Sequence, residues 1–358
     1  MRTLVVSDLH LGAASGRARL DDDGAVEALG QAAAKSNRLV LLGDVIELRQ
    51  RPMRDALAAA SRVLPRLVAG MEPGSEVVLV AGNHDHGLLS AWIARRGANA
   101  SPPAMTLETS VDWSAGEALA AVAEMLARFG AQVRAVYPGV WLREDVYATH
   151  GHYLDPHSTA PGFERLGAGV MSKLLKLAPG ELRCVDEYER ILAPIYAWML
   201  AISERGGPEL DAADGGGSSR VLRLLREGGL KGNAVQLGVS AAARLLQLAG
   251  LGELSGDVSR SALSRNELRA LGAVLLNLGV DAKYVLFGHT HRAGPLPADN
   301  AARWVAPTGA RLLNSGCWVE ESAALMSPTE APSSGYRAGF AIELEDQGPP
   351  RLVNLLES

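Results

Sequence analysis

Short apolar runs and longer amphipathic segments alternate along the first third of the chain. Runs rich in Val and Leu cover residues 3–6, 39–42 and 77–81, and each ends in a polar cluster. Between them, residues 25–34 and 54–69 are rich in Ala and Leu at helical spacing. Buried strands that alternate with helices are typical of layered α/β proteins. The pattern therefore predicts an α/β fold in which polar turns follow the strands.

The rest of the chain divides into a helical stretch and a second group of strands. These later strands are predicted at residues 140–148, 284–287, 312–314, 340–344 and 351–355. Between about residues 161 and 280, Leu and Ala dominate, and Gly-rich breaks separate helical stretches. We therefore expect a core built from residues 1–158 and 282–358, interrupted by a helical insertion, residues 159–281, that forms a cap.

The composition is that of a soluble globular protein. Hydrophobic residues make up 47% of the 358 residues, and 35 Lys and Arg stand against 40 Asp and Glu, which gives a net charge of -5. This composition excludes disorder as the main state, and the lack of a basic surplus argues against a stable nucleic-acid partner. The N-terminus has no signal-peptide pattern, so we expect a cytoplasmic protein. The nearest approach to a membrane span, residues 191–202, is too short and predicts a buried helix, with peripheral membrane contact as the alternative.

The histidines are concentrated in four short segments. All eight lie within residues 10, 84–86, 150–157 and 289–291, and the 131 positions from 158 to 288 contain none. The motifs are Asp8-Leu9-His10, Gly82-Asn83-His84-Asp85, Thr149-His150-Gly151-His152 and Gly288-His289-Thr290-His291. Each motif follows an apolar strand, and strand ends in layered α/β proteins bring side chains to one edge of a sheet. We therefore expect these segments to form one metal-binding floor.

The residue types at these strand ends suit divalent metal ions. In an Asp-x-His sequence on extended backbone the two side chains share a face, so Asp8 and His10 can bind one ion together, and His289 and His291 repeat the spacing. Carboxylate, imidazole and amide ligands without thiolate favour Mn, Fe, Zn or Co over a structural zinc site. Six or seven ligands exceed the needs of one ion. Two ions are therefore predicted, with Asp44, alone after its strand, as the bridge between them.

Taken in chain order, five pieces of the sequence resemble the calcineurin-like metallophosphoesterase superfamily. They are Asp8-x-His10, Gly43-Asp44, Gly82-Asn83-His84-Asp85, His150 in His-Gly-His, and Gly288-His289-x-His291. Each piece is weak alone, but their shared order at strand ends makes the match specific. The resemblance covers about residues 1–157 and 282–318. It implies a β-sandwich flanked by helices, in α/β/β/α layers, and leaves the helical insertion unexplained.

The resemblance also implies a role for each matching residue. One metal ion would be held by Asp8, His10 and His291, the other by Asn83, His150 and His289, and Asp44 would bridge them. His84 would lie over the substrate phosphate and protonate the leaving oxygen, while Asp85 would orient its imidazole. Manganese is the first expectation for both ions, with iron, zinc or cobalt as alternatives. Hydroxide held between the two ions would attack the phosphorus.

For other polar residues the sequence leaves alternatives open. His86, His152 and His157 either line the pocket, support ligands through hydrogen bonds or are ordinary loop histidines. Of these, His152 is the candidate for substrate contact. Arg220 and Arg223 recur at helical spacing and could face a phosphate, although a solvated helix face explains them as well.

Within the superfamily, two motifs are similar to those of UDP-2,3-diacylglucosamine hydrolases. They are Ser7-Asp8-Leu9-His10-Leu11-Gly12 and Gly43-Asp44-Val45-Ile46-Glu47-Leu48, and a helical insertion precedes the last motif. That branch has Arg where this chain has His84, and a shorter insertion. We predict hydrolysis of a phosphodiester or pyrophosphate in a small nucleotide- or lipid-linked substrate, which the cap selects. The alternatives are a phosphomonoesterase and a non-catalytic scaffold that binds a partner or a membrane.

Overall fold

The computed structural model describes residues 1–13, 18–158, 163–205, 260–320 and 335–357. Its first sheet has the strand order β10-β9-β1-β2-β3-β5, and β4 also pairs with β5. The strands are β1 (Thr3–Val6), β2 (Arg38–Leu42), β3 (Glu76–Val80), β4 (Glu108–Val111), β5 (Gln132–Arg143), β9 (Phe340–Leu344) and β10 (Arg351–Asn354). Strands β1, β2, β3 and β5 run parallel, so their carboxyl ends lie at one edge of the sheet.

Strand β5 belongs to two sheets. Its first half, Gln132 to Val136, pairs with β3, and its second half, from Gly139, pairs antiparallel with β6. The second sheet continues in the order β5-β6-β7-β8. Its other strands are β6 (Val146–Thr149), β7 (Tyr284–Phe287) and β8 (Arg311–Asn314). The first and last parts of the chain therefore meet in one continuous strand path that passes from one sheet to the other.

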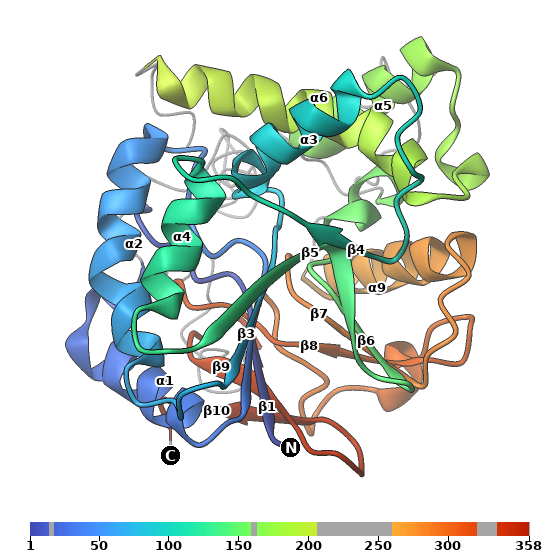
Figure 1. Ribbon diagram of the computed structural model, residues 1–358. Coiled ribbons are helices and arrows are strands. Elements are labelled where there is room, and N and C mark those ends of the chain that lie inside the picture. The colour runs from blue at the N-terminus through green and yellow to red at the C-terminus, as the bar shows by residue number, and fades with distance from the viewer. Residues whose placement is uncertain (14–17, 159–162, 206–259, 321–334, 358) are drawn as a thin grey trace, which may run out of the picture.

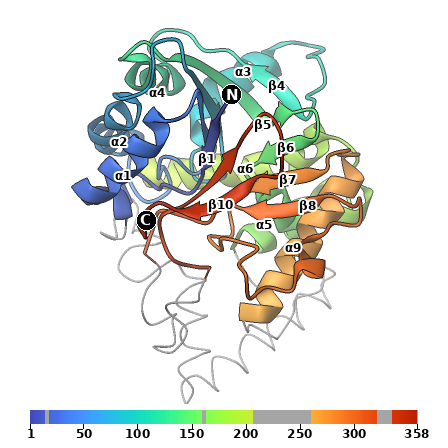
Figure 2. The ribbon, with the colours of Figure 1, turned by 90° about the horizontal axis from the view of Figure 1, so that it is seen from below.

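Alternating side chains along the strands build three apolar cores, and these define the layers. In β1, Leu4 and Val6 pack with the helices on the outer face of the first sheet, whereas Val5 packs with residues of the second sheet. The outer helices are α1 (Asp23–Ala34), α2 (Met53–Val68) and α4 (Ala118–Ala127). On the other side, Leu271 of α9 (Arg260–Asn277) packs against Phe287 of β7. Figures 1 and 2 show α1, α2 and α4 on one side of the strands and α9 on the other. The helix–sheet–sheet–helix order predicted from the sequence is confirmed.

A third group of helices lies over the carboxyl ends of the strands. It contains α3 (Ser90–Ala98), α5 (Phe163–Leu175) and α6 (Val185–Glu204), which lie together at the top of Figure 1. The apolar run 191–202 falls in α6, where Ile191, Leu192 and Ile195 are buried in the main core. Core packing therefore accounts for these buried positions, whereas Trp198 of the same run is 51% exposed. Among the described residues, no helix combines the length and apolarity that crossing a membrane requires.

The helices of the predicted insertion, residues 159–281, do not all lie over the carboxyl ends of the strands. Helix α9 forms an outer layer of the sandwich, although it falls within the range 159–281. Arg220 and Arg223 lie outside the described residues. Within the described residues of this range, all regular elements are helical.

One strand prediction is wrong. Residues 140–148 form the end of β5 and the whole of β6 up to Ala148, separated by a turn at Glu144 and Asp145. The apolar pattern continues on both sides of the turn, and the two strands were therefore predicted as one. The charged run Arg143-Glu144-Asp145 was the signal for the turn.

Candidate metal centre

The predicted ligands all follow strands whose carboxyl ends meet above the two sheets. Asp8 and His10 follow β1, Asp44 follows β2, and Asn83 follows β3. His150 follows β6, and His289 and His291 follow β7 in the second sheet. The structure brings these seven side chains together in overlapping groups that are geometrically able to hold metal ions.

The backbone at these positions is unusual. Six non-glycine residues in the described part of the chain have positive φ, and five of them are predicted ligands: Asp8 (56°), His10 (46°), Asp44 (53°), His289 (67°) and His291 (57°). Residues other than glycine rarely adopt this left-handed backbone conformation. When they do, the backbone strain is concentrated at functional sites. Close packing around the loops adds a further constraint, because a Cβ atom at Gly43 would collide with the ring of His150. The loops are thus shaped around the placement of these side chains.

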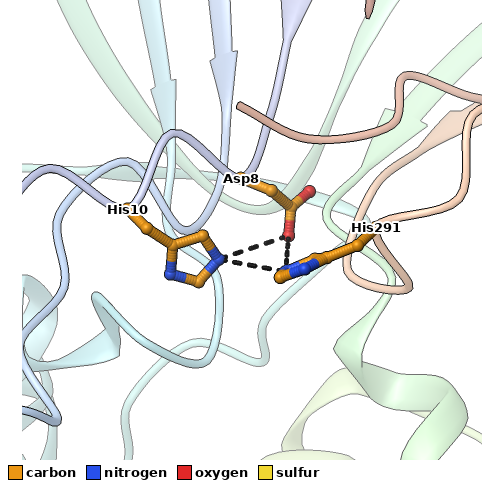
Figure 3. Close-up of side chains that lie close together, drawn as sticks. All are labelled: Asp8, His10 and His291. Atoms are coloured by element: carbon orange, nitrogen blue, oxygen red, sulfur yellow. Dashed lines mark hydrogen bonds and ion pairs between the residues drawn. The ribbon is translucent and has the colours of Figure 1, made fainter. Parts of the chain in front are cut away.

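Asp8, His10 and His291 form the first ligand group (Figure 3). The Nε2 atoms of His10 and His291 lie 3.1 Å apart, and Asp8 Oδ1 lies 3.3 Å from His291 Nε2. Asp8 Oδ1 is buried and has no hydrogen-bond partner among the described residues. Burial alone would raise the pKa of Asp8, but His291 and His150 outweigh it and hold the pKa below its usual value. The group therefore directs a carboxylate and two imidazole nitrogens at one point, which suits a divalent cation.

Asn83, His150 and His289 form the second ligand group, beside Asp44. Asn83 Oδ1 lies 3.2 Å from His150 Nε2 and 3.0 Å from His289 Nδ1. If the side-chain amide of Asn83 is flipped by 180°, its NH₂ group donates to Asp44, His150 and His289 instead. With its oxygen inward, three potential acceptors face one another, which is the arrangement that a cation would stabilise.

Asp44 lies between the two ligand groups. Its Oδ2 atom is 3.3 Å from His150 Nε2 and 3.9 Å from His10 Nε2. Burial alone would raise the pKa of Asp44, but His150 and His84 outweigh it, so the pKa lies well below its usual value. Asp44 is therefore an anion in the position from which one carboxylate can reach both groups.

Outer partners fix which nitrogen of each imidazole faces the centre. His10 Nδ1 lies 3.0 Å from Glu47 Oε2, His150 Nδ1 lies 2.9 Å from the carbonyl oxygen of Leu42, and His289 Nε2 lies 2.9 Å from Asp155 Oδ1. An acceptor at one ring nitrogen keeps the proton there and leaves the lone pair of the other nitrogen directed inward. Glu47 and Asp155 were not predicted from the sequence. The three-residue spacing from Asp44 was a signal for Glu47, and Asp155 had no comparable signal.

His84 lies at the more open side of the centre. Its side chain is 18% exposed, and its Nε2 atom lies 2.9 Å from Arg49 Nη1. Burial and Arg49 would lower the pKa of His84, but Glu47 and Asp44 outweigh them and raise it. The geometry also allows a third group of His10, Asp44 and His84 around one ion.

The expectation that Asp85 orients His84 is wrong. His84 Nδ1 lies 2.7 Å from Glu47 Oε2, so Glu47 provides that contact. The carboxylate of Asp85 instead accepts hydrogen bonds from the backbone N–H groups of Gly82 at 2.6 Å and Val45 at 2.7 Å. These backbone donors surround Asp85, so its carboxylate joins the loops after β2 and β3 and does not face the imidazole.

The structure also places His152 away from a substrate. His152 is 1% exposed, and its Nε2 atom lies 2.9 Å from the hydroxyl of Tyr137. Its ring lies beside that of His150, with the ring centroids 5.6 Å apart. His152 therefore has a supporting position behind a ligand, and the predicted substrate contact is corrected.

Comparison with known proteins agrees with this geometry. A family model described as calcineurin-like phosphoesterase matches residues 1–168, a range that contains every predicted ligand except His289 and His291. No curated protein matches the sequence. The two remaining histidines lie beyond the matched range, but the structure brings them into the same centre. The match and the geometry together support a place in the calcineurin-like phosphoesterase superfamily, a family of metal-dependent hydrolases of phosphoesters.

Proposed function

We propose that the protein is a dinuclear-metal phosphoesterase that cleaves a phosphodiester or a pyrophosphate. The observation that carries this proposal is the position of Asp44, whose Oδ2 atom lies within 4 Å of histidines from both ligand groups. One ion in each group, with one carboxylate between them, is the arrangement that two-metal hydrolases require. Manganese suits the mixed oxygen and nitrogen ligands, as do iron, zinc and cobalt.

Two divalent cations would supply an activated water molecule and neutralise the charge of the phosphate oxygens. The remaining chemistry falls to residues at the open side of the centre. Glu47 holds Nδ1 of His84, so the Nε2 atom is directed away from Glu47 and towards Arg49. A guanidinium can only donate, so in the structure Nε2 accepts the hydrogen bond of Arg49. Once Arg49 turns to a substrate phosphate, a protonated Nε2 can give its proton to the leaving oxygen. Arg49 adds positive charge where a phosphate would bind.

The similarity of two sequence motifs to those of UDP-2,3-diacylglucosamine hydrolases supports a small nucleotide- or lipid-linked substrate. His84 in place of Arg sets this chain apart from that branch. An imidazole can transfer a proton near neutral pH, whereas a guanidinium stays charged. We therefore place the chemistry with phosphodiesters and pyrophosphates whose leaving group needs protonation.

The test compares a diester with a monoester. Metal-stripped protein is assayed on bis-p-nitrophenyl phosphate and on p-nitrophenyl phosphate, with and without added Mn²⁺, and Asp44→Asn is the control. We expect Mn²⁺-dependent cleavage of the diester above the monoester, and a loss of about 10³-fold in Asp44→Asn, because the shared carboxylate is gone. Faster cleavage of the monoester would favour a phosphomonoesterase. Two bound ions with no cleavage of either substrate would favour the scaffold alternative, and no bound metal would overturn the proposal.

A further inference from the structure

A second buried polar cluster lies behind the metal centre. At its middle is Glu189 of α6, which is 8% exposed. Glu189 Oε2 lies 3.0 Å from His86 Nε2, and Glu189 Oε1 accepts hydrogen bonds from the hydroxyls of Tyr137 and Tyr153, each at 2.7 Å. His152 completes the cluster through its contact with Tyr137. We call Glu189, His86, Tyr137, His152 and Tyr153 the Glu189 cluster.

The partners of Glu189 belong to the loops that carry two metal ligands. His86 begins the short helix His86–Leu89, three residues after Asn83. Tyr153 lies in the short helix His152–His157, three residues after His150. One carboxylate from α6 therefore joins the two loops that place Asn83 and His150 in the second ligand group.

The third member of that group is tied to the same region. His289 Nε2 lies 2.9 Å from Asp155, which is in the short helix His152–His157 together with Tyr153. By contrast, Asp8 and His10 of the first ligand group are held by the loop after β2. The N–H of Asp8 donates to the carbonyl of Gly43 at 3.0 Å, and that of His10 donates to the carbonyl of Asp44 at 2.9 Å.

The protonation states favour strong hydrogen bonds in the Glu189 cluster. Burial and Glu189 raise the pKa values of Tyr137 and Tyr153 well above the usual value, so both hydroxyls keep their protons. Burial alone would raise the pKa of Glu189, but His86 and the two tyrosine hydroxyls outweigh it and lower the pKa. An anion that accepts hydrogen bonds from such donors in a buried site makes strong bonds, and moving any partner away would leave a charge without compensation.

We propose that Glu189 is a positioning residue through which helix α6 holds the second ligand group at coordinating distance. The inference rests on the proposed dinuclear centre. According to this inference, helix α6 of the helical insertion raises the affinity of the second ligand group for its metal ion and leaves the affinity of the first group unchanged. Glu189 touches neither metal nor substrate in this scheme, and it acts through the loops of Asn83 and His150.

The test measures metal binding and not activity. Full-length, metal-stripped protein is titrated with Mn²⁺ by calorimetry, and the coupling between bound Mn²⁺ ions is followed by electron paramagnetic resonance. We expect wild type to bind two ions. In Glu189→Gln one ion should keep its affinity, and the other should bind about 10-fold more weakly, at the lower end of effects seen for partners of metal ligands. The signal of coupled ions should decline accordingly at limiting Mn²⁺.

Two further variants complete the experiment. Tyr153→Phe removes one hydrogen-bond donor and keeps the carboxylate of Glu189, so it should weaken the binding of the same ion by a smaller factor. If Glu189→Gln does not fold, Tyr153→Phe is the variant that tests the inference. Glu343→Gln is the matched control, because Glu343 is similarly buried at 9% exposed and is bound by charged partners, but lies in β9. It should bind both ions as wild type does.

Two results would overturn the inference. One is wild-type binding of both ions in Glu189→Gln and Tyr153→Phe, and the other is equal weakening of both ions. Failure of the dinuclear centre itself has a different signature, because wild type would then bind fewer than two ions before any variant is compared.

Discussion

The metal-ligand groups and the Glu189 cluster are neighbouring buried regions built from the same kinds of residue, histidines and carboxylates. In the Glu189 cluster both carboxylate oxygens have hydrogen-bonding partners, the hydroxyls of Tyr137 and Tyr153 at one oxygen and Nε2 of His86 at the other. In the ligand groups, potential acceptors face one another, as with the Nε2 atoms of His10 and His291 at 3.1 Å, and Asp8 Oδ1 has no hydrogen-bond partner among the described residues. Buried polar groups normally have hydrogen-bond partners. The ligand groups lack enough hydrogen-bond donors for their acceptors, and a bound cation would satisfy those acceptors. Nδ1 of His152 in the Glu189 cluster also has no hydrogen-bond partner among the described residues, so what separates the two regions is the pairing of their carboxylate oxygens, and not burial.

After the loss expected of Asp44→Asn, the largest expected effect is that of a substitution at His84, which tests whether His84 is a proton donor or a metal ligand. We expect His84→Gln to lower kcat for the diester by about 10²-fold or more, because the leaving oxygen loses its proton donor. The number and affinity of bound Mn²⁺ ions should stay unchanged. Steady-state kinetics and calorimetry on the same protein check both statements.

A different outcome would move His84 into the ligand set. The geometry permits a group of His10, Asp44 and His84. If His84→Gln loses Mn²⁺ affinity along with activity, His84 is a ligand and its role as a proton donor is contradicted. Unchanged kcat would contradict both roles.

The next prediction concerns the stability that a cation adds. At a free Mn²⁺ concentration of 100 times the dissociation constant, each site should stabilise the folded state by about 2.7 kcal/mol, because only the folded chain assembles the ligands. Thermal unfolding with Mn²⁺ and with EDTA measures this as a rise in Tm. A Tm that does not respond to Mn²⁺ would remove the distinction between the two regions, because the ligand groups would then be as self-sufficient as the Glu189 cluster.

The sequence placed the predicted ligands at strand ends because their signals are local, and the structure brings these side chains together. Each follows a short apolar run, so Asp44 and His150 could be placed at strand ends before their contacts were known. The role of Asp85 was taken over from the family resemblance. In this chain the bend after β3 turns the Asp85 carboxylate to the N–H groups of Gly82 and Val45, and no local pattern in the sequence indicates that turn.

Glu189 shows what local signals leave out. It lies on the buried face of α6 with Val185, Tyr188 and Leu192, at helical spacing. An acidic residue in an apolar stripe was therefore a visible signal. Its partners, however, lie 36 residues away at Tyr153 and 103 residues away at His86, and only the fold brings them together.

The smallest expected effect belongs to the control variant Glu343→Gln, whose residue lies in β9 opposite Leu4, near the amino end of β1. Burial alone would raise the pKa of Glu343, but Arg2 and Arg351 outweigh it and hold the pKa below its usual value of 4.5. A lowered folded-state pKa gives stability that is complete above about pH 4.5 and is lost as the pH falls through the folded-state value. Glu343→Gln should therefore be less stable than wild type by about 1 kcal/mol or less near pH 7, and the gap in Tm should narrow below about pH 4.5. A gap that stays constant down to pH 3 would mean that packing, and not charge, accounts for the role of Glu343, and Glu343→Gln would then be a poor match for Glu189→Gln.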